Sequence, residues 1–166
     1  MALAASYVSM LDEFTAAGEP YHQKNQQDAH EDIAGLLRRW EERRNARNLK
    51  PGQPAATNYW LVRDGAEVVG SGRVRHWLTE ATFRCAGHVG YDIRPSARGR
   101  GYATLLCGLL LDEARKMGIV RALLTCNGDN YASIRVIEKN SGRYHSTIQL
   151  PQGRNHMRFW VDLARP

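Results

Sequence analysis

The segment best suited to chemistry is a short alternation of arginine and glycine, Arg98 to Gly101, which follows a predicted strand ending at Arg94-Pro95. Glycines let successive backbone N–H groups point into one concavity, because no Cβ stands in the way. An apolar helix is predicted directly afterwards, and its N-terminus adds a partial positive charge. The segment therefore predicts a loop that binds a phosphate group, although a tight turn between a strand and a helix would explain the bare glycines as well.

This loop differs from two common phosphate-binding motifs. A P-loop needs Gly-Lys-Ser/Thr after its second glycine, and the dinucleotide motif needs a third glycine where Thr104 stands. Arg98 and Arg100 can donate charge-assisted hydrogen bonds to phosphate. Residues 1–50 hold 7 Lys/Arg and 8 Asp/Glu, whereas residues 51–166 hold 16 and 9, a net charge of +7. That charge is typical of a solvated surface or of an anionic ligand, either a phosphorylated cofactor or nucleic acid.

Two segments in this half of the chain resemble one known family. Arg98-x-x-Gly101-x-Ala103, after a strand ending in Arg-Pro, resembles the acyl-CoA signature R/Q-x-x-G-x-G/A of the GNAT superfamily of N-acetyltransferases. The segment from Asn130 to Asn140 is similar to the second cofactor segment of that family. The resemblance is close over residues 86–142 and looser over the strands that precede them.

The resemblance implies an acyl-CoA-dependent N-acyltransferase that moves acetyl from acetyl-CoA to a primary amine by direct attack. It places the CoA pyrophosphate on the loop, the pantetheine arm along the backbone of the preceding strand, and the second segment across the cleft. The residues implied in binding acetyl-CoA are Tyr91, Ile93, Arg98, Gly99, Arg100, Gly101, Tyr102, Ala103, Asn130 and Ser133.

The general base is a separate question, because an amine must lose a proton when it attacks. His88 has a suitable intrinsic pKa and stands where ribosomal-protein-type relatives often have a glutamate. Strict strand alternation puts His88 on the face opposite Tyr91 and Ile93, and a β-bulge would place it on their face. We predict His88 as the catalytic base, with a structural histidine as the alternative and His76 as the rival.

The group that protonates the departing thiolate is also open. Many relatives have a tyrosine at the position that is Ile137 here, and isoleucine cannot donate a proton. Tyr131, Tyr144 and Cys126 are near in sequence, and nothing selects among them. Cys126 ends a predicted buried strand, where cysteine is more often a small core residue than a nucleophile. The isoleucine therefore also suggests a non-catalytic CoA-binding module.

Composition and length frame these expectations. The 166 residues, 43% apolar and 24% charged, predict one globular domain over residues 1–166. Three widely spaced cysteines fit neither a disulfide framework nor a metal site, which predicts a reducing, cytoplasmic setting. Six scattered histidines predict no metal. No apolar run is long enough for a membrane span, and the first residues lack the pattern of a secretory signal.

Hydrophobic periodicity supplies the elements that position the loop. We predict helices at 4–17, 31–46, 100–117 and 130–140, and strands within 59–77, 86–93, 119–126, 143–150 and 157–163. Asp28 is the predicted cap of the second helix, the residues before it form a polar loop, and Asp64-Gly65 indicates a hairpin turn. The predicted fold is a mixed, mostly antiparallel, splayed sheet flanked by helices. GNAT relatives usually begin with a further strand, which is absent here or supplied by residues 1–5.

The sequence indicates the acyl acceptor and the binding partners less directly than it indicates the donor. A small-molecule or peptide amine is expected, with no membrane partner, and transfer from an aminoacyl-tRNA on the same fold is the alternative. Dimers are common in the family that the chain resembles. Four aromatic residues of the strands are expected to pack in the core or to line the acceptor pocket: Tyr59, Trp60, Trp77 and Trp160.

Overall fold

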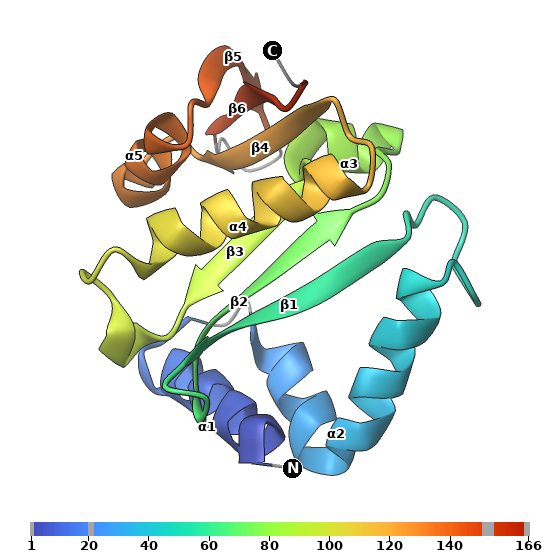
Figure 1. Ribbon diagram of the computed structural model, residues 1–166, viewed down its shortest axis with the longest axis vertical. Helices are drawn as coiled ribbons and strands as arrows, with labels where there is room; N and C mark the ends of the chain where they lie inside the picture. The colour runs from blue at the N-terminus through green and yellow to red at the C-terminus, as the bar shows by residue number, and fades with distance from the viewer. Residues whose placement is uncertain (1, 20–21, 151–154, 165–166) are drawn as a thin grey trace.

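The computed structural model describes residues 2–19, 22–150 and 155–164 (Figure 1). The elements in chain order are α1 (Ala2–Ala16), α2 (Gln23–Arg44), β1 (Ala56–Arg63), β2 (Glu67–Arg75), α3 (Glu80–Cys85), β3 (Val89–Ile93), the 3-10 helix η2 (Pro95–Ala97), α4 (Tyr102–Lys116), β4 (Arg121–Asn127), α5 (Tyr131–Lys139), β5 (Arg143–Gln149) and β6 (Asn155–Asp162). None of the described helices is both long and apolar enough to cross a membrane.

The six strands form one sheet in the order β1-β2-β3-β4-β6-β5. All neighbouring strands run antiparallel except β3 and β4, which are parallel. Helix α4 packs on β2 and β3 from one face, and α1 and α2 pack on β1 and β2 from the other (Figure 1). The predicted mixed, mostly antiparallel sheet flanked by helices is therefore confirmed.

The two parallel strands meet at one end only. β3 and β4 share a single register pair, Val89 with Leu124, whereas β4 and β6 pair along seven residues. Two bonds reinforce the joined end: the His88 N–H donates to the Leu123 carbonyl at 2.7 Å, and the Leu123 N–H donates to the His88 ring at 2.9 Å. Beyond this point the strands diverge, so the splay predicted from the sequence is present.

Two hydrophobic cores hold the layers together. The larger core lies between the sheet and α4, whose buried Leu106, Leu110 and Ala114 follow one another at helical spacing. The smaller core lies under the first two helices, where α1 buries residues that recur at i, i+3, i+4 and i+7. Those residues are Tyr7, Met10, Leu11 and Phe14.

The first half of α2 differs from the sequence-based expectation. The polar segment before residue 31 was predicted as a loop, but it is helical, and Asp28 pairs with Arg39 instead of capping the helix. Its polar side chains bond neighbours across the helix pair, as Gln26 does with Asp12 at 2.8 Å. Asp32 interrupts the helix with a φ of −156°, and its carboxylate accepts the Gly35 N–H at 2.8 Å. The helix therefore restarts close to the predicted position.

The remaining elements agree with the prediction apart from one short helix. Asp64 and Gly65 have φ values of 50° and 69°, as a two-residue hairpin turn requires. Helix α3 was not predicted, because six residues give little periodicity, and it begins with a capping box on Thr79. In the described residues no strand precedes α1, and β1 is an edge of the sheet.

Candidate active site

The predicted phosphate loop lies at the open end of β3. Gly99 and Gly101 have φ values of 74° and 82°, in the left-handed region that favours glycine. A Cβ built on either would meet nothing within 4 Å, so the loop leaves open space beside its backbone. Gly101 offers α4 no side-chain cap, and the N–H groups of Gly99, Arg100 and Gly101 make no backbone hydrogen bond to another described residue. The loop and the helix N-terminus together present donors that an anion can accept.

The two arginines of the loop differ in their partners. The Arg98 guanidinium holds Glu19 with two bonds of 2.6 and 2.9 Å, and its Nε donates to the Ile93 carbonyl at 3.2 Å. It also lies over the Phe14 ring, so the Arg98 side chain braces the loop against α1. Arg100 is exposed and makes no ion pair with a described residue. A phosphate contact from Arg98 would require it to leave Glu19, whereas Arg100 is available.

The backbone edge of β3 faces the point where β4 diverges. The Arg94 N–H donates to the Val69 carbonyl on β2, and backbone groups alternate between the two edges of a strand. The N–H and C=O groups of Tyr91 and Ile93 therefore point toward β4. Their side chains pack in the larger core together with Tyr102 and Ala103. This edge is where the pantetheine arm was predicted to bind.

Ser133 contacts Tyr91 across the diverging strands, and Asn130 caps the helix that carries Ser133. The Asn130 side chain caps α5 by accepting the Ser133 N–H at 3.0 Å, and the Tyr91 hydroxyl donates to the Ser133 carbonyl at 3.5 Å. Burial raises the pKa of the Tyr91 hydroxyl, so it stays protonated at neutral pH. The sequence-predicted residues of the two segments thus gather on both sides of the divergence.

The structure gives no proton donor at the family's usual position. Ile137 is buried in the larger core, which accounts for an isoleucine there. Tyr131 and Tyr144 are 71% and 56% exposed. Burial raises the pKa of the Cys126 thiol to about 11, so at neutral pH this thiol is protonated and a poor nucleophile.

His88 lies at the joined end of β3 and β4. Its Nδ1 accepts the Leu123 N–H, and the residue is 8% exposed. Burial, and then the charge of Arg75, lower the pKa of His88 to about 4. His76 bonds the Thr57 hydroxyl at 2.9 Å, and burial lowers its pKa. The contacts of His88 thus support the structural alternative, and its catalytic role stays a prediction.

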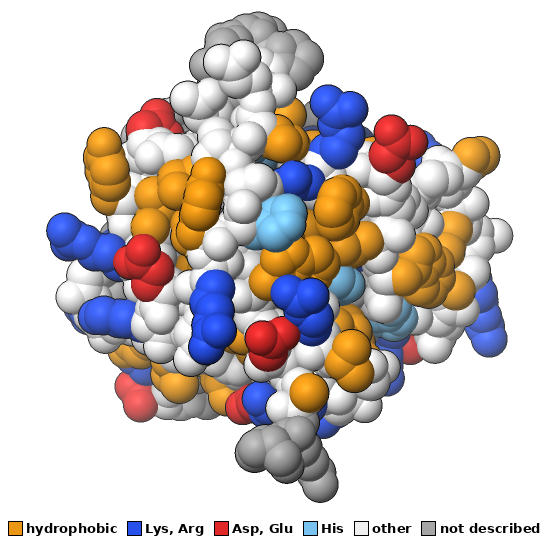
Figure 2. Space-filling view, turned by 90° about the horizontal axis from the view of Figure 1, so that it is seen from above, with side chains coloured by type: hydrophobic (Ala, Val, Ile, Leu, Met, Phe, Trp, Pro, Cys, Tyr) orange, Lys and Arg blue, Asp and Glu red, His pale blue; other side chains and the backbone are white. Residues whose placement is uncertain are grey.

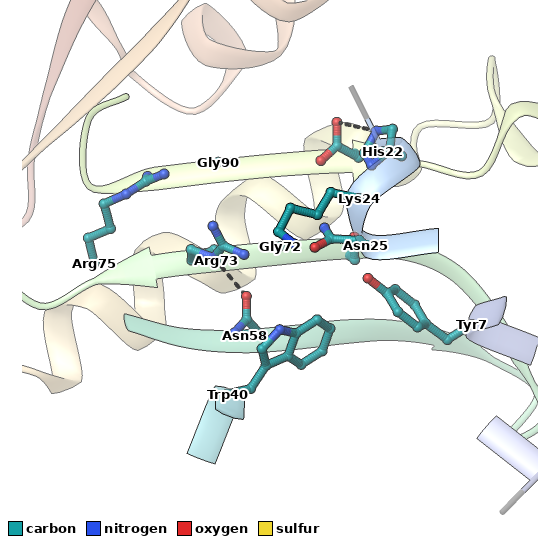
Figure 3. Close-up of a pocket in the computed structure, with 12 residues that line it drawn as sticks. Tyr7, His22, Lys24, Asn25, Trp40, Asn58, Gly72, Arg73, Arg75 and Gly90 are labelled. Carbon is teal, nitrogen blue, oxygen red and sulfur yellow. Dashed lines mark hydrogen bonds and ion pairs between the residues drawn. The ribbon is translucent and has the colours of Figure 1, made fainter. Parts of the chain in front are cut away.

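A cavity of about 300 Å³ lies on the face of the sheet that α1 and α2 cover (Figure 3). Gly90 and Asp92 reach it from β3, on the face opposite Tyr91 and Ile93. The other lining residues are Tyr7, His22, Lys24, Asn25, Trp40, Asn58, Ser71, Gly72, Arg73 and Arg75. None of the four strand aromatics considered from the sequence lines it.

Polar contacts fix several of these side chains. His22 stacks on Phe14, with ring centroids 3.9 Å apart, and its Nε2 lies 3.5 Å from the Asp92 carboxylate. Arg73 donates from Nε to the Asn58 side-chain oxygen at 2.8 Å. This bond leaves the Asn58 Nδ2 buried, with no hydrogen-bond partner in the described structure. Both pairs are drawn in Figure 3.

This cavity was not predicted from the sequence, although part of its signal is visible in the chain. Ser71, Arg73 and Arg75 alternate with Gly72 and Val74 on β2, which indicates one polar and one apolar face. Figure 2 shows basic side chains interspersed with acidic and hydrophobic ones over the described residues at the end with β5 and β6. Two of the cationic residues of the cavity, Arg73 and Arg75, lie instead on the covered face of β2.

The comparisons with known proteins identify the family and agree with the fold. The family model described as an acetyltransferase (GNAT) domain matches residues 5–142. The chain therefore belongs to the GNAT acetyltransferase family, whose acyl donor is acetyl-CoA. A search of curated protein sequences found no significant match.

Solved structures show the same fold at low sequence identity. The chain resembles yncA from Salmonella typhimurium, solved with its cofactor acetyl-CoA, at 17% identity and a TM-score of 0.59 over 81% of this chain and 76% of the other. It resembles a ribosomal-protein-alanine N-acetyltransferase from Brucella melitensis at 18% identity and a TM-score of 0.57, over 77% of each chain. It resembles a mutant of the spermidine N-acetyltransferase SpeG from Vibrio cholerae at 12% identity and a TM-score of 0.59, over 78% of this chain and 75% of the other.

Proposed function

We propose that the protein transfers the acetyl group of acetyl-CoA to the primary amine of a small-molecule or peptide acceptor. One observation carries the proposal: β3 is accessible from two directions. Its backbone edge at Tyr91 and Ile93 faces the divergence from β4, and Gly90 and Asp92 face the cavity on the other side of the sheet. Donor and acceptor can therefore meet at one strand without sharing a binding surface.

The residues at the divergence fit acetyl-CoA. The open space beside Gly99 and Gly101 is where a Cβ would otherwise stand, and the N–H groups there suit a pyrophosphate. Arg100 adds an exposed cation, and the backbone edge of β3 offers donors and acceptors to an extended arm. When bound, acetyl-CoA supplies an acyl group activated as a thioester.

The cavity supplies what an attacking amine needs. Gly90 has no side chain, and a Cβ there would meet nothing within 4 Å, so an acceptor can approach the β3 backbone closely. The amine nitrogen forms a C–N bond as the C–S bond breaks, the sulfur leaves as the CoA thiolate, and the nitrogen loses a proton. Asp92 and His22 lie in the cavity and support a route for that proton. His88 remains the base predicted from the sequence, and a variant described below tests it.

Binding and turnover test the proposal separately. Acetyl-CoA should raise the melting temperature in a dose-dependent way, with about 2.7 kcal/mol of added stability at a concentration ~100-fold above Kd. Release of free CoA thiol should then depend on an added amine. A clear shift with aminoacyl-tRNA and none with acetyl-CoA would overturn the proposed donor. A shift with acetyl-CoA, but no thiol release with any class of amine, would identify a CoA-binding module instead.

A further inference from the structure

The cavity beside Gly90 contains more positive than negative charge. Its lining includes three cations, Lys24, Arg73 and Arg75, and one carboxylate, Asp92. The Lys24 side chain is 87% exposed, and its Nζ lies 3.6 Å from the carboxylate of Asp28, a residue that does not line the cavity. Lys24 therefore lies at the mouth of the cavity. The two arginines extend from the covered face of β2 (Figure 3). The inner part of the cavity is therefore cationic except at Asp92.

Hydrogen bonds to uncharged groups help to hold both arginines in place. No acidic side chain of the described residues lies within ion-pair distance of Arg73, whose Nε is bonded to Asn58. Arg75 donates from Nη1 to the carbonyls of Ala86 and Gly87. A third arginine, Arg43, is close enough for their charges to act on it: burial first, and then Arg73 and Arg75, lower its pKa to about 10. An anion bound beside Arg73 would relieve this like-charge repulsion.

Asn58 adds an unused donor beside the same guanidinium. The Arg73 bond occupies the Asn58 oxygen and so orients the amide, which leaves Nδ2 buried without a partner. A buried polar group without a hydrogen bond destabilises the folded state, and such groups are rare in folded proteins. Asn58 lines the cavity, so a ligand oxygen would satisfy Nδ2 once the amide turns toward it. The pairing of a guanidinium with an adjacent amide N–H suits a carboxylate.

The negative charge of the cavity, on Asp92, lies further along the strands from Arg73. Arg73 pairs with Gly90 and Ser71 pairs with Asp92, so the two pairs are about 7 Å apart along β2 and β3. Asp92, with His22 beside it, can receive an ammonium group, and Gly90, opposite Arg73, leaves the β3 backbone open next to it. At about 300 Å³ the cavity is at the small end of ligand sites. It therefore suits one small zwitterion.

We propose that this cavity binds the acyl acceptor as a free amino acid, with its carboxylate on Arg73 and the Asn58 Nδ2 and its amino group between Gly90 and Asp92. The proposal rests on the acetyl transfer proposed above and names the substrate class of the same site. Polyamines fit poorly, because they would bring several positive charges to a cationic cavity.

Matched acceptors test this substrate class. Free CoA thiol is measured with the twenty L-amino acids, and each amino acid that reacts is compared with its amide and with its decarboxylated amine. We expect kcat/KM at least tenfold higher for the amino acid than for either counterpart, mainly through a lower KM. Equal values across a matched set would overturn the carboxylate subsite while leaving acetyl transfer intact.

Two variants locate the carboxylate. Arg73→Leu should lower kcat/KM for the amino acid at least tenfold, change that for the amide little, and leave the KM for acetyl-CoA unchanged. Asn58→Asp keeps the size of the side chain and the bond to Arg73, but places a negative charge where the carboxylate would bind, so it should have the same effect. Arg47→Leu removes one positive charge from an exposed position outside the cavity and is the matched control.

The outcomes separate the two proposals. If a polyamine or a peptide N-terminus is acetylated and no amino acid is, the amino-acid inference is overturned and the proposed function remains. If acetyl-CoA binds and no amine of any class releases thiol, the proposed function itself fails. If both variants are folded and retain the preference of the wild type for the amino acid over its amide, the carboxylate does not bind at Arg73 and Asn58.

Discussion

The pH dependence of folding gives the sharpest test of His88. Burial, and then the charge of Arg75, lower its pKa from 6.5 to about 4. The folded protein keeps this imidazole neutral, whereas the unfolded chain takes up a proton below pH 6.5. The stability that this group contributes is therefore fully present above pH 6.5 and is lost as the pH falls toward 4. At 1.36 kcal/mol for each pKa unit, the loss is about 3 kcal/mol.

The variant His88→Asn isolates this effect. The Asn oxygen can accept the Leu123 N–H as Nδ1 does, but it does not titrate. The free energy of unfolding is measured with denaturant for both proteins between pH 4 and 7.5. The wild-type value minus the variant value should rise by about 3 kcal/mol across this range, and other titrating groups cancel in the difference. Parallel curves would refute the neutral, buried histidine described here.

The same variant distinguishes the two roles considered for His88. If this imidazole is the general base, His88→Asn lowers kcat by roughly 10²–10⁴-fold while the affinity for acetyl-CoA stays unchanged. If the ring only joins β3 to β4, kcat stays within a few-fold of the wild type. His88→Leu is the companion variant, because it leaves the buried Leu123 N–H without an acceptor and should cost about 1–3 kcal/mol of stability.

Two further results are expected. Gly101→Glu should weaken acetyl-CoA binding at least tenfold in a titration, because it places a carboxylate where we propose that the phosphates bind. Gly118→Glu is the control and should bind acetyl-CoA normally, since Gly118 has the same φ of 82° and equally open space at the other end of α4. In thiol labelling of the folded protein, the exposed Cys85 should react first. Cys107 and Cys126 should stay protected, because burial raises the pKa of their thiols to about 12 and about 11. Fast labelling of Cys126 would contradict its place in the core.

The elements predicted correctly are those whose signals are local. The Asp64-Gly65 turn, the apolar face of α4 and the glycines of the loop each lie within one short window of sequence, and each follows from the conformations that those residues prefer. The prediction of a loop for the polar first half of α2 was wrong for a related reason. Its helical conformation depends on contacts with α1, such as Gln26 with Asp12, and no periodic apolar signal accompanies them.

The cavity could not be predicted in the same way, because its residues are distant in sequence. Tyr7, Asn58 and Arg73 become neighbours only when α1 packs on the sheet and β1 pairs with β2. The partner of Arg98 is a similar case, since Glu19 precedes it by 79 residues. From the sequence a loop arginine next to glycines indicates a phosphate ligand, and only the fold shows that a carboxylate already holds this one.

The geometry of β3 connects these observations. A strand offers four directions, two edges and two faces, and β3 uses each for a different purpose. One edge pairs with β2, and the other, at Tyr91 and Ile93, is the edge on which we propose that acetyl-CoA binds, because β4 diverges after Val89. One face carries the side chains of Tyr91 and Ile93 into the core beneath α4, and the other presents Gly90 and Asp92 to the cavity. A one-residue slip of β3 would exchange both faces and both edges at once. The contacts of His88 and Leu123 at the joined end oppose that slip. With both substrates bound as proposed, this histidine would help to place them even if it never takes a proton from the amine.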